Sequence, residues 1–320
     1  HPVIIDGFSQ TGATCGTLLV ELDGTNAGSG NGLALASGST GSTIRGLAIN
    51  RFPANGIYIV SSSNTINCCY IGTNVTGTSD RGNTWFGLEI VSSSNTIRNN
   101  VISGNDDTGI DLQGTNADYN TVAGNYIGTN AAGTSAIPNG AGASDGAWWS
   151  KNGIFIRDGA NNNTIGGSTV ADRNIISGNI NDGIAMTASS TLNNTIEGNY
   201  IGINAAGTSA LPNGLGIFIL FDPNFTVIRN NVISGNAQSG IELFSGSNGT
   251  IIQGNYIGTN AAGTAAIGNG LRGININVGC LGTVIGGTTA SLRNIISGNA
   301  SDGIYIASGD NNTVIQGNYI

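Results

Sequence analysis

Two acidic residues and one arginine stand out as side chains that could act on a substrate. Glu89 and Asp111 occupy the same position in two successive copies of a short recurring phrase, and Arg157 follows a later copy. If the copies are neighbouring strands, the two carboxyl groups lie about 4.8 Å apart, near the separation that a retaining glycosidase uses. Arg157 is the nearest base for a lyase reaction. The alternative is that these acids only solubilise an outer face.

A tryptophan pair lies in the same region of the chain. Trp148 and Trp149 fall in the longest connection between two copies of the phrase, from Gly109 to Gly153. Aromatic side chains stack on sugar rings, so these two residues are the candidates for substrate binding. Asp106 and Asp107 lie close by in the expected stack.

The phrase that positions these residues is Gly-apolar-x-apolar, and its alternation has the period of a strand with one buried face. The spacing between copies is mostly about 22 to 33 residues, as in repeat proteins. The copies begin at Gly32, Gly56, Gly87, Gly109, Gly153, Gly183, Gly216, Gly240, Gly273 and Gly303.

Two further short strands follow each copy. The second carries a column of buried apolar residues, namely Ile44, Ile66, Ile97, Val122, Ile165, Ile196, Ile228, Ile252, Ile285 and Ile315. Just before the third strand lies an asparagine column, which consists of Asn100, Asn125, Asn174, Asn199, Asn231, Asn255, Asn294 and Asn318, with Leu47 and Cys69 in the first two coils. Because an amide both donates and accepts, this column predicts a ladder of hydrogen bonds. The run Asn161–Asn163 is expected to be exposed.

Three strands per copy predict an all-β solenoid in which each coil contacts only its neighbours. We expect one domain over residues 1–320, with about ten to eleven coils at about 4.8 Å per rung. A longer period of 120 residues groups the coils in fours, and alternate coils carry an excursion at residues 131–140, 205–214 and 261–270. These excursions should form a ridge. The domain is expected to be part of a longer chain or of a polymer.

The phrases at residues 124–128 (Gly-Asn-Tyr-Ile-Gly) and 173–179 (Arg-Asn-Ile-Ile-Ser-Gly-Asn) resemble those of the right-handed parallel β-helix repeat proteins. These belong to the pectate-lyase-like superfamily of bacterial secreted and surface proteins, and the resemblance covers roughly residues 17 to 320. It implies a single right-handed parallel β-helix and an extracellular or cell-surface location. Members that resemble polygalacturonase carry a Gly-His-Gly signature, whereas the single histidine here is His1.

The composition excludes several classes of partner. The net charge is −8 and the single lysine is Lys151, so neither nucleic acid nor anionic lipid is expected to bind. No apolar run approaches the ~18 residues of a membrane span.

The sequence does not determine which of the four cysteines form a disulfide. Cys68 and Cys69 point in opposite directions on an extended chain, and Cys280 lies many coils away. Either Cys15 forms a bridge to the second coil, or the cysteines are small core or ladder substitutes.

We therefore expect an extracellular structural or adhesive surface protein, with fibre formation by end-to-end stacking of coils as its extension. The alternatives are a polysaccharide-active lyase or hydrolase and a passive glycan-binding module. Whether the chain is an enzyme stays open at this stage, with the balance against it. No cofactor is expected; a calcium site made by grouped acids is the alternative.

Overall fold

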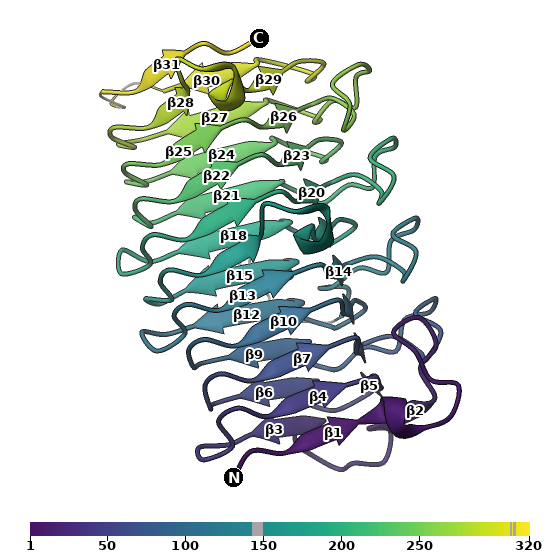
Figure 1. Cartoon of the computed structure of the whole chain (residues 1–320). Coiled ribbons are helices and arrows are strands. Elements are labelled where there is room, and N and C mark those ends of the chain that lie inside the picture. Colours follow the sequence, from purple (N-terminus) through teal and green to yellow (C-terminus); the bar gives the residue numbers. More distant parts are fainter. Residues whose placement is uncertain (143–149, 308, 310–311) are drawn as a thin grey trace.

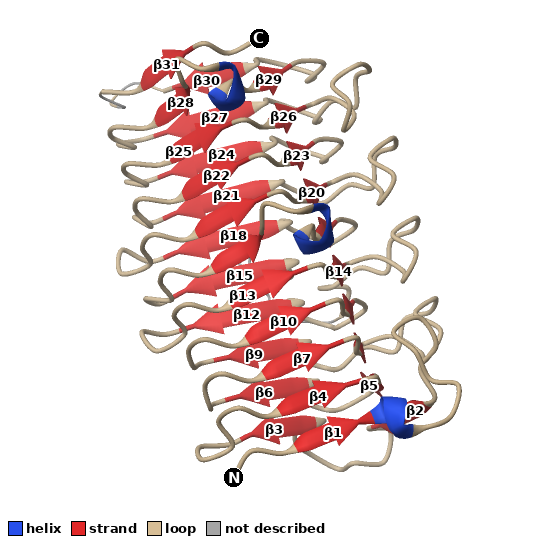
Figure 2. Ribbon diagram, in the orientation of Figure 1, coloured by secondary structure: helices blue, strands red, loops and turns tan. Residues whose placement is uncertain are grey.

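The chain forms an elongated stack of coils, each lying on the next (Figure 1). The computed structural model describes residues 1–142, 150–307, 309 and 312–320. Strands and turns make up almost all of this part, and the three short 3₁₀ helices η1 (Gly7–Ser9), η2 (Val170–Asp172) and η3 (Ala290–Leu292) lie in its connections (Figure 2). Within the described residues, the strands form three parallel sheets, which we call sheets I, II and III.

Sheet I contains 11 strands among the described residues. They are β1 (Ile4–Asp6), β4 (Thr43–Arg45), β7 (Thr65–Asn67), β10 (Thr96–Arg98), β13 (Thr121–Ala123), β16 (Thr164–Gly166), β19 (Thr195–Glu197), β22 (Val227–Arg229), β25 (Ile251–Gln253), β28 (Val284–Gly286) and β31 (Val314–Gln316).

Sheet II has 10 described strands and follows the first corner of each coil. They are β2 (Val20–Asp23), β5 (Leu47–Asn50), β8 (Tyr70–Ile71), β11 (Val101–Ile102), β14 (Tyr126–Ile127), β17 (Ile175–Ile176), β20 (Tyr200–Ile201), β23 (Val232–Ile233), β26 (Tyr256–Ile257) and β29 (Ile295–Ile296).

Sheet III, again with 10 described strands, carries the recurring glycine phrase. Its strands are β3 (Leu33–Leu35), β6 (Ile57–Ile59), β9 (Leu88–Ile90), β12 (Ile110–Gln113), β15 (Ile154–Arg157), β18 (Ile184–Thr187), β21 (Ile217–Leu220), β24 (Ile241–Phe244), β27 (Ile274–Asn277) and β30 (Ile304–Ile306).

The register confirms the predicted columns. Ile97 pairs with Ile66 on one side and with Val122 on the other, and all three side chains are fully buried. Each β-branched side chain therefore packs on its equivalent in the next coil, which suits a pleated, buried surface. The interior of the rod is a continuous column of such residues, and the predicted all-β parallel solenoid is confirmed.

The predicted asparagine ladder is also confirmed. The backbone N–H and Nδ2 of Asn100 both donate to Oδ1 of Asn125, at 2.9 and 3.0 Å. The same pair of bonds recurs at each step as far as Asn318. At the preceding rung Cys69 stands in for asparagine, and its N–H donates to Oδ1 of Asn100 at 2.8 Å. Cys69 is thus the expected ladder substitute.

Two further ladders occupy the other corners of the coil. One precedes sheet I and consists of Asn64, Asn95, Asn120, Asn163 and Asn194. The other precedes sheet III and consists of Asn83, Asn105, Asn139, Asn179, Asn213, Asn236, Asn269 and Asn299. The expectation that the Asn161–Asn163 run offers a fully exposed asparagine was wrong: Asn163 is a fully buried rung because it faces the corner, and Asn161 and Asn162 are half-buried.

The excursions of alternate coils form the expected ridge on one flank (Figure 1). The N–H of Ala131 donates to the carbonyl of Gly77 in the excursion two coils before, at 2.9 Å. Ala205 and Ala261 repeat this bond to Gly133 and Gly207. The ridge therefore begins one excursion earlier than the sequence predicted, at residues 73–80.

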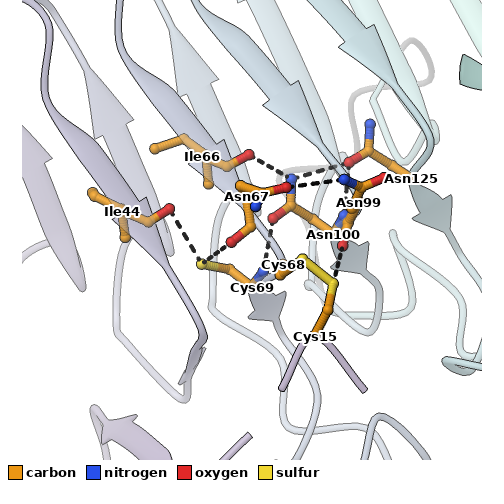
Figure 3. The surroundings of a disulfide bond; sticks show 9 residues. All are labelled: Cys15, Ile44, Ile66, Asn67, Cys68, Cys69, Asn99, Asn100 and Asn125. Carbon is orange, nitrogen blue, oxygen red and sulfur yellow. Dashed lines mark hydrogen bonds between the residues drawn. A yellow bond between two sulfur atoms is a disulfide. The ribbon is translucent and has the colours of Figure 1, made fainter. Parts of the chain in front are cut away.

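A disulfide joins Cys15 to Cys68 (Figure 3). It pins the segment between β1 and β2, residues 7–19, to the second coil. Leu18 of this segment is buried against Ala48 and Tyr70 on the outside of sheet II. Of the two alternatives left open by the sequence, the bridge to the second coil is confirmed for Cys15, whereas the thiols of Cys69 and Cys280 are buried and donate to the carbonyls of Ile44 and Asn277.

Candidate functional site

The outer face of sheet III brings the three predicted catalytic residues together. Asp111 of β12 pairs directly with Glu89 of β9, as the repeat predicted. Arg157 ends β15 and pairs with Gln113, two residues beyond Asp111. Residues on either side of each acid are buried in the core, so both carboxylates point outward from the strand.

Arg157 holds Asp111 in a two-bond clamp. Its Nε donates to Oδ1 at 3.0 Å and its Nη2 donates to Oδ2 at 2.9 Å. The same guanidinium also donates to Gln113 and to the exposed Asp158. Asp111 has 0% of its side chain exposed, so both oxygens lie below the surface and are already used. In this arrangement the pair is a buried ion pair, and its catalytic role stays a prediction.

Burial raises the pKa of Asp111 to about 6. The hydrogen bonds and the charge of Arg157 oppose this rise, whereas the charges of Glu89 and Asp107 add to it. The desolvation of the carboxylate is therefore only partly offset by its arginine partner.

Glu89 is the more accessible of the two acids. Its Oε2 accepts a hydrogen bond from Nδ2 of Asn55 at 2.6 Å, and half-burial of the side chain raises its pKa. It borders a hollow of about 410 Å³, the Glu89 hollow, which is also lined by Tyr58, Val91, Gln113, Gly114, Thr115 and Asn116. A half-buried acid beside an open hollow can exchange a proton with a bound molecule.

The tryptophan pair cannot be placed against these acids, because Trp148 and Trp149 lie outside the described residues. Their role in substrate binding stays a prediction. Near the acids, Asp107 accepts hydrogen bonds from the N–H groups of Thr108 and Lys151. Burial and the neighbouring Asp80 raise the pKa of Asp106.

Asp182 is a titratable residue that the sequence analysis did not predict. Burial raises the pKa of Asp182 to about 7, and the N–H of Leu215 donates to its Oδ1 at 3.3 Å. The signal was available, because Asp182 directly precedes Gly183, the start of a copy of the repeat. A chain with 18 acids offers too many such positions for one to stand out.

Within residues 1–142, 150–307, 309 and 312–320, no three His, Cys, Asp or Glu side chains are grouped as metal ligands. The calcium alternative accordingly has no assigned ligands and stays a prediction. A search of the same residues for a helix long and apolar enough to span a membrane finds none.

Comparison with known proteins places the fold. The family model described as "Right handed beta helix region" matches residues 20–212 and 143–320. No curated protein sequence matches the chain.

Three solved structures illustrate the likeness. The Dettilon tailspike protein (gp208) has a TM-score of 0.55 and 16% identity over 94% of this chain and 57% of its own. A mutant of the periplasmic alginate epimerase AlgG has 0.53 and 15%, over 88% and 68%. The Agl-KA catalytic domain has 0.52 and 16%, over 87% and 47%. At such identities the likeness shows the fold alone, and the chain spans little more than half of the tailspike chain.

Proposed function

The chain belongs to the right-handed beta helix family, and from this premise we propose that it is the rigid rod of an extracellular structural or adhesive surface protein. The proposal includes contact with polysaccharide, which the surroundings of Glu89 suit. It does not require turnover of the polysaccharide.

The observation that carries the proposal is the unbroken asparagine ladder from Asn100 to Asn318. The same pair of hydrogen bonds joins its eight asparagines in seven steps, and all but the last of these side chains are fully buried. Buried amides satisfied on both sides hold successive coils in one register. A catalytic cleft usually interrupts such regularity, whereas a rod depends on it.

The disulfide between Cys15 and Cys68 supports a location outside the cytosol. Disulfides persist in oxidising compartments and are rare where thiols are kept reduced. The structures with a similar fold include a tailspike protein and a periplasmic epimerase, which agrees with this location.

A polysaccharide-active enzyme is the second candidate, and Glu89 is the observation that favours it. The decisive experiment incubates the protein with neutral and acidic polysaccharides and follows new reducing ends and unsaturated products. A rod that only binds releases neither. Product that appears with the unmodified protein and disappears with Glu89→Gln would replace the structural function by the enzymatic one.

Fibre formation is the further extension of the structural proposal. Outermost strands such as β1 and β31 each have one edge that pairs with no other described strand, and such edges can accept a strand from a second copy. Electron micrographs of purified protein distinguish filaments, which the extension requires, from separate rods, which would refute it.

A further inference from the structure

We infer that a groove along the edge between sheets III and I binds a neutral oligosaccharide. The inference rests on the proposed adhesive function and names its contact surface. The groove has a volume of about 600 Å³. We call it the tyrosine groove and define it by Val60, Ser62, Val91, Ser93, Asn116 and Tyr119.

The groove arises from a difference in turn length. After β9 the chain needs only residues 91–94 to reach the ladder residue Asn95, whereas after Leu112 in β12 it uses residues 113–119 to reach Asn120. The longer turn stands out from the edge as a wall. Beside it the shorter turns of the two preceding coils stack closely, with Oγ of Ser62 and Oγ of Ser93 3.2 Å apart.

Tyr119 forms the exposed part of this wall. Its backbone has φ 57°, in the left-handed region that bulky residues rarely adopt, and at the same corner other coils have Ser63, Ser94 and Asn162. Its N–H donates to the carbonyl of Asn161, so the turn is fixed to the next coil. The side chain is nevertheless 63% exposed. Phe225 shares this backbone and exposure, so what distinguishes Tyr119 is that its ring lines the groove and is open to a ligand there.

The chemistry of the lining suits a sugar. Val60 and Val91 provide an apolar floor, and the ring of Tyr119 provides an apolar wall against which the C–H face of a pyranose can pack. Hydroxyl and amide groups around them can exchange hydrogen bonds with sugar hydroxyls; they belong to Ser62, Ser93, Thr115 and Asn116. The volume lies within the range of small-molecule sites, about 300–1,000 Å³.

The tyrosine groove continues into the Glu89 hollow, beside the predicted catalytic residues. Val91, Thr115 and Asn116 line both the tyrosine groove and the Glu89 hollow, so the two form one surface across neighbouring coils. An extended oligosaccharide can therefore lie across the turn edge with one end near Glu89.

The charges select an uncharged ligand. Asp118 lies in the tyrosine groove and Glu89 in the adjoining hollow, while the described residues that line the two include neither lysine nor arginine. The charge of Arg157 acts on Glu89, but its guanidinium is already held by Asp111 and Asp158. A uronate polymer would meet two carboxylates and no lysine or arginine among the described lining residues, which disfavours its binding. A neutral glycan has no such cost.

The test titrates the protein with cellohexaose, xylohexaose and mannohexaose, and with hexamers of galacturonate and mannuronate. The variant is Tyr119→Asn, because asparagine accepts the left-handed backbone and occupies the equivalent position at Asn162. The matched control is Phe225→Asn. Phe225 has φ 58°, is 58% exposed, and occupies the same corner three coils further along, outside the groove.

We expect at least one neutral hexamer to bind, Tyr119→Asn to weaken its binding at least tenfold with an unchanged midpoint of thermal unfolding, and Phe225→Asn to leave it unchanged. Equal loss in both variants, no effect of Tyr119→Asn, tighter binding of the uronate hexamers, or no binding of any neutral hexamer would each overturn the inference. Adhesion to whole polysaccharide is measured separately. If adhesion persists when the hexamer result fails, the groove is wrong and the adhesive function stands.

Discussion

Arg157 binds Asp111 through two parallel hydrogen bonds across strands β15 and β12, and thereby closes one of the two acids on the outer face of sheet III. Breaking such a buried pair from one side leaves an uncompensated charge, at a cost of about 3–5 kcal/mol. Arg157→Met should therefore lower the free energy of unfolding by about that amount in urea titrations. The matched control is Arg272→Met, which removes an exposed partner of Asp302 and should cost under about 1 kcal/mol. Equal losses in the free energy of unfolding would show that the buried pair stabilises the fold no more than the exposed pair does.

The same pair gives stability a specific dependence on pH. The pKa of Asp111 is raised to about 6 in the fold, against about 3.9 in an unfolded chain. Folding therefore favours the protonated form, so the contribution of Asp111 is fully present below about pH 4 and is lost as the pH rises through 6. The loss is on the order of 3 kcal/mol.

Asp111→Asn should flatten this part of the pH profile. Urea unfolding at pH 4 and at pH 7 measures the difference, and Asp158→Asn is the control because it removes an exposed carboxylate from the same guanidinium. If both variants keep the slope of the unmodified protein, Asp111 is not the group responsible.

The ladder predicts a sharp contrast between two asparagines. Asn199 receives two hydrogen bonds from Asn174 and gives two to Asn231, all of them buried. Asn199→Leu removes the oxygen that accepts both bonds from Asn174 and the side-chain donor to Asn231, while the backbone N–H of residue 199 remains, and it should cost about 1–3 kcal/mol. Asn26→Leu changes an exposed residue and should cost far less. Thermal unfolding of both variants checks this, and equal shifts would refute the role of the ladder.

The strap at residues 7–19 should depend on its disulfide. Reduction of the bond between Cys15 and Cys68 frees a segment that otherwise closes a loop of 53 residues, and the expected loss is about 2–4 kcal/mol. A reducing agent should lower the midpoint of thermal unfolding of the unmodified protein and leave that of Cys15→Ala unchanged. A shift of the same size in Cys15→Ala would assign the effect to another group.

Sequence periodicity was sufficient for the architecture. The isoleucine column at Ile97 and the ladder at Asn100 recur at fixed distances from each other, so counting alone aligned them. In the ladder before sheet III Asn139 is out of step, because an insertion separates it from Gly153; Asn105 and Asn179 lie four residues before Gly109 and Gly183, so the same counting could have found this ladder.

Contacts between individual side chains were harder to predict from the sequence than the arrangement of the coils. Asp111 and Arg157 lie 46 residues apart; the pairing of β12 with β15 follows from the repeat, but the direction in which the guanidinium turns onto the carboxylate does not. The position of Cys15 beside Cys68 depends on how residues 7–19 fold over sheet II, where no repeat guides the chain. The tyrosine groove depends on the length of one turn, which the repeat does not predict.

The central claim is that the rod holds polysaccharide without cleaving it, and an adsorption experiment measures this most directly. The protein is mixed with insoluble neutral glucan and xylan, and both the protein left in solution and the soluble sugar released are measured over time. The account predicts that protein leaves the solution while no soluble sugar appears, and that Tyr119→Asn stays in solution. Sugar that accumulates in proportion to the protein, and stops with Glu89→Gln, would contradict it.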